Sequence, residues 1–125
     1  MKKYRIMTVE DNEIFAMILD WNLKEDLDYT LTNVTSGEEC IEQLDEWKPD
    51  MIIMDYMLPG LNGLDILKKI KKLKLKPKLK VIILSSQTSV QVAVDLINAG
   101  AEQYIEKNKD PLIKLSKYIN EIRFQ

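Results

Sequence analysis

The chain has 125 residues, of which 46% are hydrophobic and 30% are charged, and its formal net charge is −2. That composition is typical of one globular domain with a substantial hydrophobic core. The chain has no histidine, one cysteine and four glycines, which excludes histidine-based catalytic triads and metal sites, internal disulfides and glycine-rich phosphate loops.

Strand-like apolar runs alternate with helical patterns five times along the chain. Strands are expected at residues 4–9, 30–34, 51–55, 80–84 and 102–106, and helices near residues 12–26, 37–47, 63–73, 88–98 and 110–123. This alternation predicts a doubly wound α/β fold, with one parallel sheet and right-handed crossover helices on both faces. No linker separates two parts of the chain, so we expect a single domain over residues 1–125.

Two helix starts are marked by their side chains. Ser36 precedes Gly37-Glu38-Glu39, which places a hydrogen-bond acceptor and early negative charge at a helix N-terminus. Pro111 follows Asp110, and proline is favoured in the first turn of a helix. Both positions support the boundaries given above.

The charge is unevenly distributed. Residues 68–80 contain eight lysines and no acidic residue, which leaves 10 basic against 20 acidic residues in the rest of the chain. A lysine run of this kind is most often a solvated face with a loop, and a docking patch for an acidic partner is the alternative. The run lacks aromatic and arginine residues, so we expect no direct contact with nucleic acid.

Nothing in the sequence predicts export or membrane insertion. No apolar stretch approaches the roughly 20 residues that span a bilayer, and the segment before the first predicted strand is too short for a signal peptide. The single cysteine, Cys40, suits a reducing compartment and a place in the core. We therefore expect a cytoplasmic protein.

Acidic side chains follow two of the predicted strands. Asp55 ends the apolar run 51–55, and Glu10-Asp11 closes the run 4–9 in the same way. Open α/β sheets bind their ligands at the carboxyl ends of the strands. Carboxylates gathered there repel one another unless a cation joins them, and hard oxygen ligands suit Mg²⁺.

Three further side chains fall at the same edge: Ser85, Tyr104 and Lys107. Taken singly, each has an ordinary explanation as a cap, a packed strand residue or a solvated lysine, and Asp55 alone could be a turn residue. Together they make a phosphoryl-transfer site, in which a carboxylate accepts phosphoryl while a metal, an ammonium and a hydroxyl neutralise the phosphoryl oxygens.

These motifs resemble those of response-regulator receiver domains of the CheY-like superfamily. The matching residues are Glu10-Asp11, Met54-Asp55 with Pro59 and Gly63, Leu84-Ser85-Ser86, and Gly100-Ala101 with Tyr104-Ile105 and Lys107. The resemblance covers the whole chain and implies a flavodoxin-like sheet with strand order 2-1-3-4-5. Because the chain ends just past the last predicted helix, a stand-alone receiver without an attached effector is expected.

The resemblance also implies roles for the site residues. Asp55 would accept the phosphoryl group. Mg²⁺, for which Mn²⁺ could substitute, would be bound directly by Asp11, Asp55 and the backbone carbonyl of Met57. Glu10 would contact the metal through water. Lys107 and Ser85 would bind the phosphoryl oxygens. Tyr104 would turn inward as Ser85 moves. Met57 and Gln87 would flank the path of the incoming phosphoryl group.

The sequence departs from the common family pattern at three places. Glu10 replaces the more frequent aspartate, Met57 and Gln87 are both uncharged, and Asn108 stands where the family usually has a proline after a cis bond. A non-proline cis bond costs about 2.5–4 kcal/mol, so the geometry of the Lys107–Asn108 peptide is left open.

The phosphoryl donor implied by the resemblance is a histidine kinase or a histidine phosphotransfer protein. The first predicted helix is apolar around more of its surface than its core contact needs. Alignment with the family pattern turns Phe15, Ile18 and Leu19 inward and leaves Met17 and Trp21 on an outer flank, where they would either fold over the core edge or dock the donor.

The expected function is therefore that of a phosphoryl-accepting signalling receiver that changes its affinity for a separate effector protein. It would catalyse only its own phosphorylation and dephosphorylation. One alternative is a receiver-like interaction module that is never phosphorylated, which is expected to have lost a key side chain. Another is an aspartyl-phosphate hydrolase, but such enzymes carry a second aspartate where this chain has Met57.

Overall fold

The computed structural model describes residues 4–24, 29–73, 79–87 and 89–123. Five parallel strands form one sheet in the order β2-β1-β3-β4-β5. The strands are β1 (Tyr4–Val9), β2 (Tyr29–Val34), β3 (Met51–Asp55), β4 (Lys80–Ser85) and β5 (Gln103–Glu106). The predicted fold class and strand order are both confirmed.

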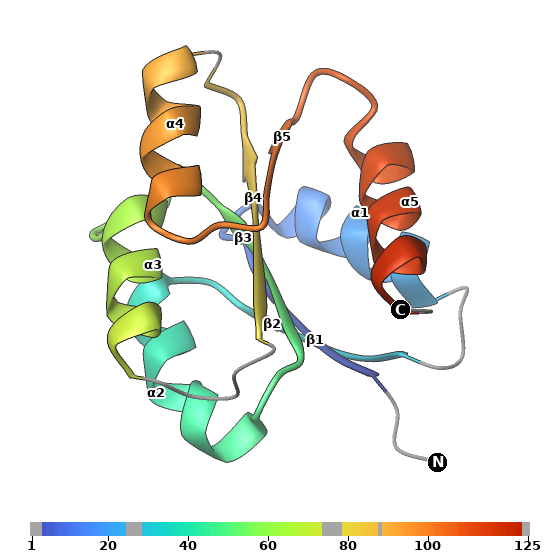
Figure 1. Ribbon diagram of the computed structural model, residues 1–125. Helices are drawn as coiled ribbons and strands as arrows, with labels where there is room; N and C mark the ends of the chain where they lie inside the picture. Colours follow the sequence, from blue (N-terminus) through green and yellow to red (C-terminus); the bar gives the residue numbers. More distant parts are fainter. Residues whose placement is uncertain (1–3, 25–28, 74–78, 88, 124–125) are drawn as a thin grey trace.

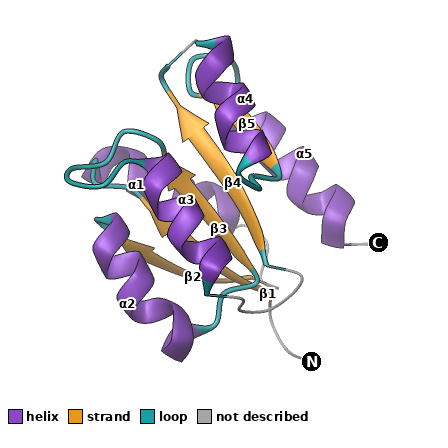
Figure 2. Ribbon diagram, turned by 60° about the vertical axis from the view of Figure 1, so that its left-hand side comes forward, coloured by secondary structure: helices purple, strands orange, loops and turns teal. Residues whose placement is uncertain are grey.

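Five helices connect the strands and cover both faces of the sheet. They are α1 (Glu13–Lys24), α2 (Gly37–Trp47), α3 (Gly63–Lys72), α4 (Val90–Asn98) and α5 (Pro111–Arg123). Helices α2, α3 and α4 lie on one face and α1 and α5 on the other (Figures 1 and 2). No helix in the described part of the chain combines the length and the apolar character that crossing a membrane requires.

Alternation along the strands divides the core between these two faces. Successive strand side chains point to opposite faces of a sheet, so β1 sends Met7 and Val9 to one core cluster and Ile6 to the other. The cluster under α2, α3 and α4 contains Cys40, which is fully buried as expected. The central strand β3 is buried along its whole length, which explains its continuous apolar sequence.

The two helix starts that Ser36 and Pro111 mark in the sequence agree with the structure. The Ser36 hydroxyl accepts a hydrogen bond from the backbone N–H of Glu39 at 3.1 Å, and Pro111 is the first residue of α5. Helix α4 begins at Val90, after the cap residue Ser89, instead of at residue 88, which is outside the described residues. The predicted end of α1 at residue 26 also lies outside them.

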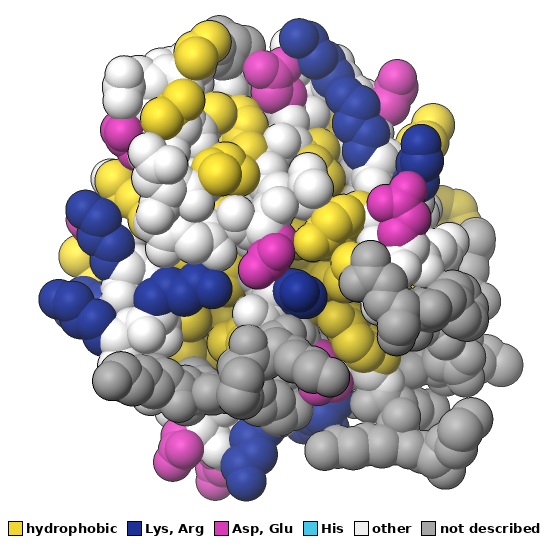
Figure 3. Space-filling view, viewed as in Figure 1, with side chains coloured by type: hydrophobic (Ala, Val, Ile, Leu, Met, Phe, Trp, Pro, Cys, Tyr) yellow, Lys and Arg dark blue, Asp and Glu magenta, His cyan; other side chains and the backbone are white. Residues whose placement is uncertain are grey.

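Part of the lysine-rich segment forms the outer surface of α3. Lys68, Lys69, Lys71 and Lys72 are all exposed, and the basic side chains of this helix lie at the surface in Figure 3. Because α3 buries Ile66, Leu67 and Ile70 beneath them, these four lysines lie on its outer side, which agrees with a solvated face and equally with a docking patch. Residues 74–78 are outside the described part of the chain.

Candidate functional site

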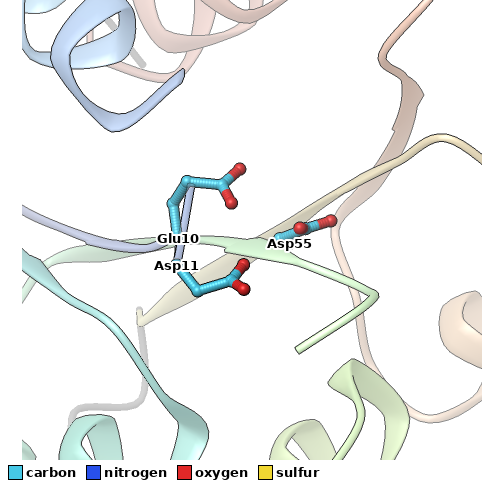
Figure 4. Close-up of side chains that lie close together, drawn as sticks. All are labelled: Glu10, Asp11 and Asp55. Atoms are coloured by element: carbon cyan, nitrogen blue, oxygen red, sulfur yellow. The ribbon is translucent and has the colours of Figure 1, made fainter. Parts of the chain in front are cut away.

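Glu10, Asp11 and Asp55 meet at the carboxyl edge of the sheet. Strands β1 and β3 are neighbours, with Val9 opposite Met54, so the residues that follow these positions end side by side. One carboxylate oxygen from each of the three acidic residues lies within 4.8 Å of the other two. Figure 4 shows Glu10 and Asp11 reaching from the end of β1 toward Asp55. Glu10 and Asp55 are buried and Asp11 is exposed.

The Glu10 carboxylate is held from two sides. One oxygen accepts a hydrogen bond from the Lys107 ammonium at 2.7 Å, and the other accepts one from the backbone N–H of Asn12 at 3.1 Å. Burial raises the pKa of the Glu10 carboxyl, and the nearby charge of Asp55 raises it further. The two hydrogen bonds lower the pKa and so oppose this rise. The carboxylate is therefore buried but partnered.

Lys107 joins the acidic residues of two strands. Its ammonium lies 2.7 Å from Glu10 Oε1 and 3.3 Å from Asp55 Oδ2. The backbone N–H of Lys107 donates to the carbonyl of Ser85 at 2.8 Å, which fixes the chain just after β5. Cis peptide bonds are absent from the described residues, so the bond between Lys107 and Asn108 is trans and the question left open by the sequence is answered.

The loop that follows Asp55 folds back tightly on itself. The backbone N–H of Gly63 donates to the carbonyl of Tyr56 at 2.8 Å. A Cβ atom at Gly63 would lie 2.9 Å from the Tyr56 Cα atom, so a side chain at this position would open the loop. The Met57 N–H points to Asp55 Oδ1 at 3.4 Å, so the loop closes over the carboxylate.

The side chains of Met57 and Gln87 contact each other. The amide nitrogen of the Gln87 side chain lies 3.8 Å from the Met57 sulfur, and 53% of Met57 is exposed. The two residues belong to different loops, one after β3 and one after β4. The structure thus joins the two side chains that the sequence places beside the path of an incoming phosphoryl group.

Ser85 and Tyr104 are linked through the backbone of Gln87. The hydroxyl oxygen of the fully buried Ser85 accepts a hydrogen bond from the Gln87 N–H at 2.9 Å. The Tyr104 hydroxyl donates to the Gln87 carbonyl at 2.6 Å, and the Tyr104 ring packs against the core. Two hydrogen bonds to the backbone of one residue thus connect Ser85 with Tyr104.

A polar network that the sequence analysis missed anchors the acidic loop. The buried Thr8 hydroxyl donates to the side-chain oxygen of Asn33 at 2.6 Å, and the Asn33 amide donates to the backbone carbonyl of Glu10 at 3.3 Å. The strand pairing of Thr8 with Asn33 brings these side chains together. Only a known register between β1 and β2 could have revealed this contact.

The outer flank of α1 is strongly apolar. Met17 is 70% exposed and Trp21 74% exposed, as the alignment predicts, so neither folds over the core edge. The inward placement of Ile18 is wrong, because 41% of this side chain is exposed. Only Leu19 and Leu23 of this helix are fully buried, so the contact of α1 with the sheet is narrower than predicted.

The family model for the response regulator receiver domain matches residues 6–119 of this chain. The chain belongs to the response-regulator receiver family. It is 31% identical over 107 residues to the chemotaxis protein CheY of Thermotoga maritima, covering 86% of this chain and 88% of that protein. This receiver also resembles, with a TM-score of 0.86 and 30% identity, the solved receiver domain of a LuxO-type repressor from Vibrio parahaemolyticus, covering 94% of this chain and 88% of that one.

Other relatives of this receiver are longer proteins. A protein-glutamate methylesterase/protein-glutamine glutaminase of Paramagnetospirillum magneticum is 33% identical over 107 residues, but the match spans 85% of this chain and only 30% of that protein. Receivers therefore occur both as most of a protein and as a small part of one. The shared portion is the signalling domain of a two-component response regulator.

Proposed function

We propose that this receiver accepts a phosphoryl group on Asp55 and thereby changes its affinity for a partner protein. The observation that carries the proposal is the position of the Lys107 ammonium, 2.7 Å from Glu10 and 3.3 Å from Asp55 at a buried strand edge. A cation at this place can neutralise a phosphoryl oxygen as readily as it now neutralises carboxylates. Ser85 supplies a hydroxyl at the next strand end.

The donor in this proposal is a phosphorylated histidine of a histidine kinase or phosphotransfer protein. An Asp55 carboxylate oxygen attacks the phosphorus, the phosphorus–nitrogen bond breaks, and the leaving imidazole nitrogen takes up a proton. The product is an acyl phosphate on Asp55. Water later attacks the same phosphorus, which releases inorganic phosphate and restores the carboxylate, so the domain turns over no separate substrate.

The acidic cluster fits a magnesium ion. Three carboxylates offer hard oxygen atoms within 4.8 Å of one another, and such ligands suit Mg²⁺ and also Mn²⁺. Asp11, Asp55 and the Met57 carbonyl are the proposed direct ligands, with Glu10 acting through water. Bound there, the ion would neutralise charge on the phosphoryl oxygens.

The output of the proposed switch runs through Ser85 and Tyr104. We infer that the Ser85 side chain rotates toward a phosphoryl oxygen, which moves its oxygen away from the Gln87 N–H that it now binds at 2.9 Å. The Gln87 carbonyl holds the Tyr104 hydroxyl at 2.6 Å, so the tyrosine responds to the same movement. This coupling supports Tyr104 as the residue that reports phosphorylation to an effector protein.

The exposed flank of α1 is the proposed docking surface for the donor protein. Met17 and Trp21 are exposed by 70% and 74%, and α1 begins directly after the acidic pair at the end of β1. Aromatic and methionine side chains are over-represented in protein interfaces. We propose a cytoplasmic setting in which this flank receives the helical domain that carries the phosphohistidine.

A labelling experiment tests the chemistry. With Mg²⁺ and acetyl phosphate, the wild-type protein should gain one acid-labile phosphoryl group, measured by intact mass, and tandem mass spectrometry should place it on Asp55. Removing Mg²⁺ or introducing Asp55→Asn should abolish the gain. Asp95→Asn, a matched change at an exposed position of α4, should label as wild type.

The same experiment distinguishes the alternatives. An unphosphorylated interaction module would show no gain of mass under any condition, although Asp11, Asp55, Ser85 and Lys107 are all present in this chain. A hydrolase would release phosphate from many substrates without retaining the label. Modification that persists in Asp55→Asn would overturn the assignment of the acceptor.

A further inference from the structure

The Lys107 ammonium has a third neighbour besides the two carboxylates. It lies 4.3 Å from the centroid of the Phe15 ring, over its face. An ammonium within about 6 Å of an aromatic centroid is attracted by the negative face of the ring. Phe15 is half-buried on α1 and is far from Lys107 in the chain. None of the family motifs in the sequence includes it.

We propose that Phe15 is a positioning residue for phosphoryl transfer, whose ring holds the Lys107 ammonium beside Asp55. The proposal rests on the proposed function, because the position of the ammonium matters only if Asp55 is phosphorylated. It adds a cation–π contact to the ion pairs at 2.7 Å and 3.3 Å that already orient Lys107. The ring acts through Lys107 and does not touch the acceptor carboxylate itself.

The Phe15 ring can keep its contact with Lys107 when the two carboxylates bind other ligands. A lysine side chain has a flexible four-carbon stem, so its ammonium keeps a fixed position only when neighbouring groups bind it. Glu10 and Asp55 are also the residues expected at the metal and the phosphoryl group, so their hold on Lys107 weakens when those ligands arrive. Phe15 carries no charge and binds no metal, and its contact is therefore free to persist through the transfer.

The beginning of α1 fixes the ring relative to the acidic residues. The Asn12 side chain accepts a hydrogen bond from the Phe15 N–H at 3.0 Å, as an N-cap residue does, while the Asn12 N–H donates to Glu10 at 3.1 Å. One short segment thus positions two of the three contacts of Lys107. This arrangement favours a shared function over an accidental meeting of two side chains.

Phe15 and Lys107 also line a hollow of about 540 Å³, together with Ile18 of α1 and with residues 110–113 at the start of α5. The edge of the ring is therefore next to open space and not sealed inside the core. Because Phe15 borders this hollow, Phe15→Tyr is the conservative rescue variant.

The test compares Phe15→Leu with Phe15→Tyr. Leucine keeps apolar bulk but removes the aromatic face, whereas tyrosine keeps it. Nuclear magnetic resonance should show the ε-methylene protons of Lys107 shifted upfield by the ring in wild type and in Phe15→Tyr, and unshifted in Phe15→Leu. Maximal labelling by phosphoramidate with Mg²⁺ should fall about threefold to tenfold in Phe15→Leu and return to within about twofold of wild type in Phe15→Tyr.

Ile113→Ala is the matched control, since Ile113 lines the same hollow and is 71% exposed; it should label as wild type. An equal loss of maximal labelling in Phe15→Leu and Phe15→Tyr, or wild-type labelling by a folded Phe15→Leu, would overturn the positioning role. The upfield shift needs no phosphodonor, so its absence in wild type overturns the contact by itself. Failure of wild type to label despite a normal shift would instead overturn the proposed function and, with it, the role of the ring in transfer.

Discussion

Glu10 shows how one methylene group changes the connections of the site. The longer side chain, in place of the family's more common aspartate, reaches Lys107 at 2.7 Å while its other oxygen binds the Asn12 N–H. Its burial to 2% exposure is possible because both oxygens have partners. The Glu10 side chain therefore links the end of β1 to the residue that follows β5.

Met57 and Gln87 give a prediction at the scale of single residues. Hydrolysis of the acyl phosphate needs an oriented water molecule, and polar groups near its path help to place it. Met57 is apolar, follows Asp55 by two residues, and its sulfur lies 3.8 Å from the side-chain nitrogen of Gln87. Met57→Asn should therefore shorten the lifetime of phosphorylated protein severalfold, measured as decay of the intact-mass label after donor removal.

Met17→Asn is the control for that lifetime measurement. It introduces the same side chain on α1, at a methionine that is 70% exposed where Met57 is 53% exposed. This variant should leave the lifetime unchanged. An equal or longer lifetime in Met57→Asn would mean that Met57 does not shield the acyl phosphate.

At the scale of elements, α4 has fewer fully buried side chains than α5. Its single fully buried side chain is Leu96, while Val90, Val94 and Ile97 are exposed, and hydrophobic side chains lie at the surface over this helix in Figure 3. β-branched residues also lose rotamer freedom in a helix. In contrast, α5 buries Leu115 and Ile119 completely.

Hydrogen exchange should reveal this difference. Backbone amides of α4 should exchange faster than those of α5, and their protection should change when a phosphate mimic such as beryllofluoride is added with Mg²⁺. The amides of α5 serve as the internal control in the same sample. Equal protection in both helices, unaltered by the mimic, would contradict a role for α4 as a responsive element.

The exposed flank of α1 gives a second prediction at this scale. Trp21→Ala should slow phosphoryl transfer from the cognate histidine kinase or phosphotransfer protein by about tenfold or more, since a lost hot-spot side chain costs roughly 2 kcal/mol. Labelling by acetyl phosphate should stay within about twofold of wild type, because Trp21 is 74% exposed and away from the core.

Val90→Ala provides the comparison for Trp21→Ala. It truncates an apolar side chain of 77% exposure on α4 and should leave transfer from the protein donor unchanged. If Trp21→Ala slows both donors alike, the tryptophan supports the site itself and does not dock a partner.

At the scale of the whole molecule, the buried Cys40 links stability to pH. Burial raises the pKa of its thiol from 9.0 to about 12, so the unfolded chain loses this proton at a lower pH than the folded protein does. The stabilising contribution is complete below about pH 9 and is lost as pH rises toward 12. Burial likewise raises the pKa of Tyr4 to about 12, which adds to the same trend.

Urea unfolding should therefore show a loss of stability on raising the pH from about 8 to about 10.5. The Cys40 part of that loss should be about 2 kcal/mol. Cys40→Ala lowers the stability at both pH values by leaving a small void, but it should make the pH dependence shallower because only the tyrosine part remains. Identical slopes in the two proteins would show that the thiol does not remain protonated in the folded state.

The sequence by itself determined the fold class, the strand order through the family resemblance, and the identity of the strand-end residues. The apolar run at residues 51–54 predicts a strand because a strand covered on both faces carries apolar side chains at successive positions. The carboxyl ends of parallel strands share one edge of the sheet, so the sequence alone predicts that Asp55 and Glu10 lie close together.

Only the tertiary structure decided which side chains hold the site together. Three contacts join residues of different elements: the Phe15 ring with the Lys107 ammonium, the Thr8 hydroxyl with Asn33, and Met57 with Gln87. The prediction that Ile18 faces inward is wrong for the same reason, since alignment with the family pattern gives the inner face of α1 but not the width of its contact with the sheet. Such contacts depend on register and on the distance between elements, which a one-dimensional pattern does not contain.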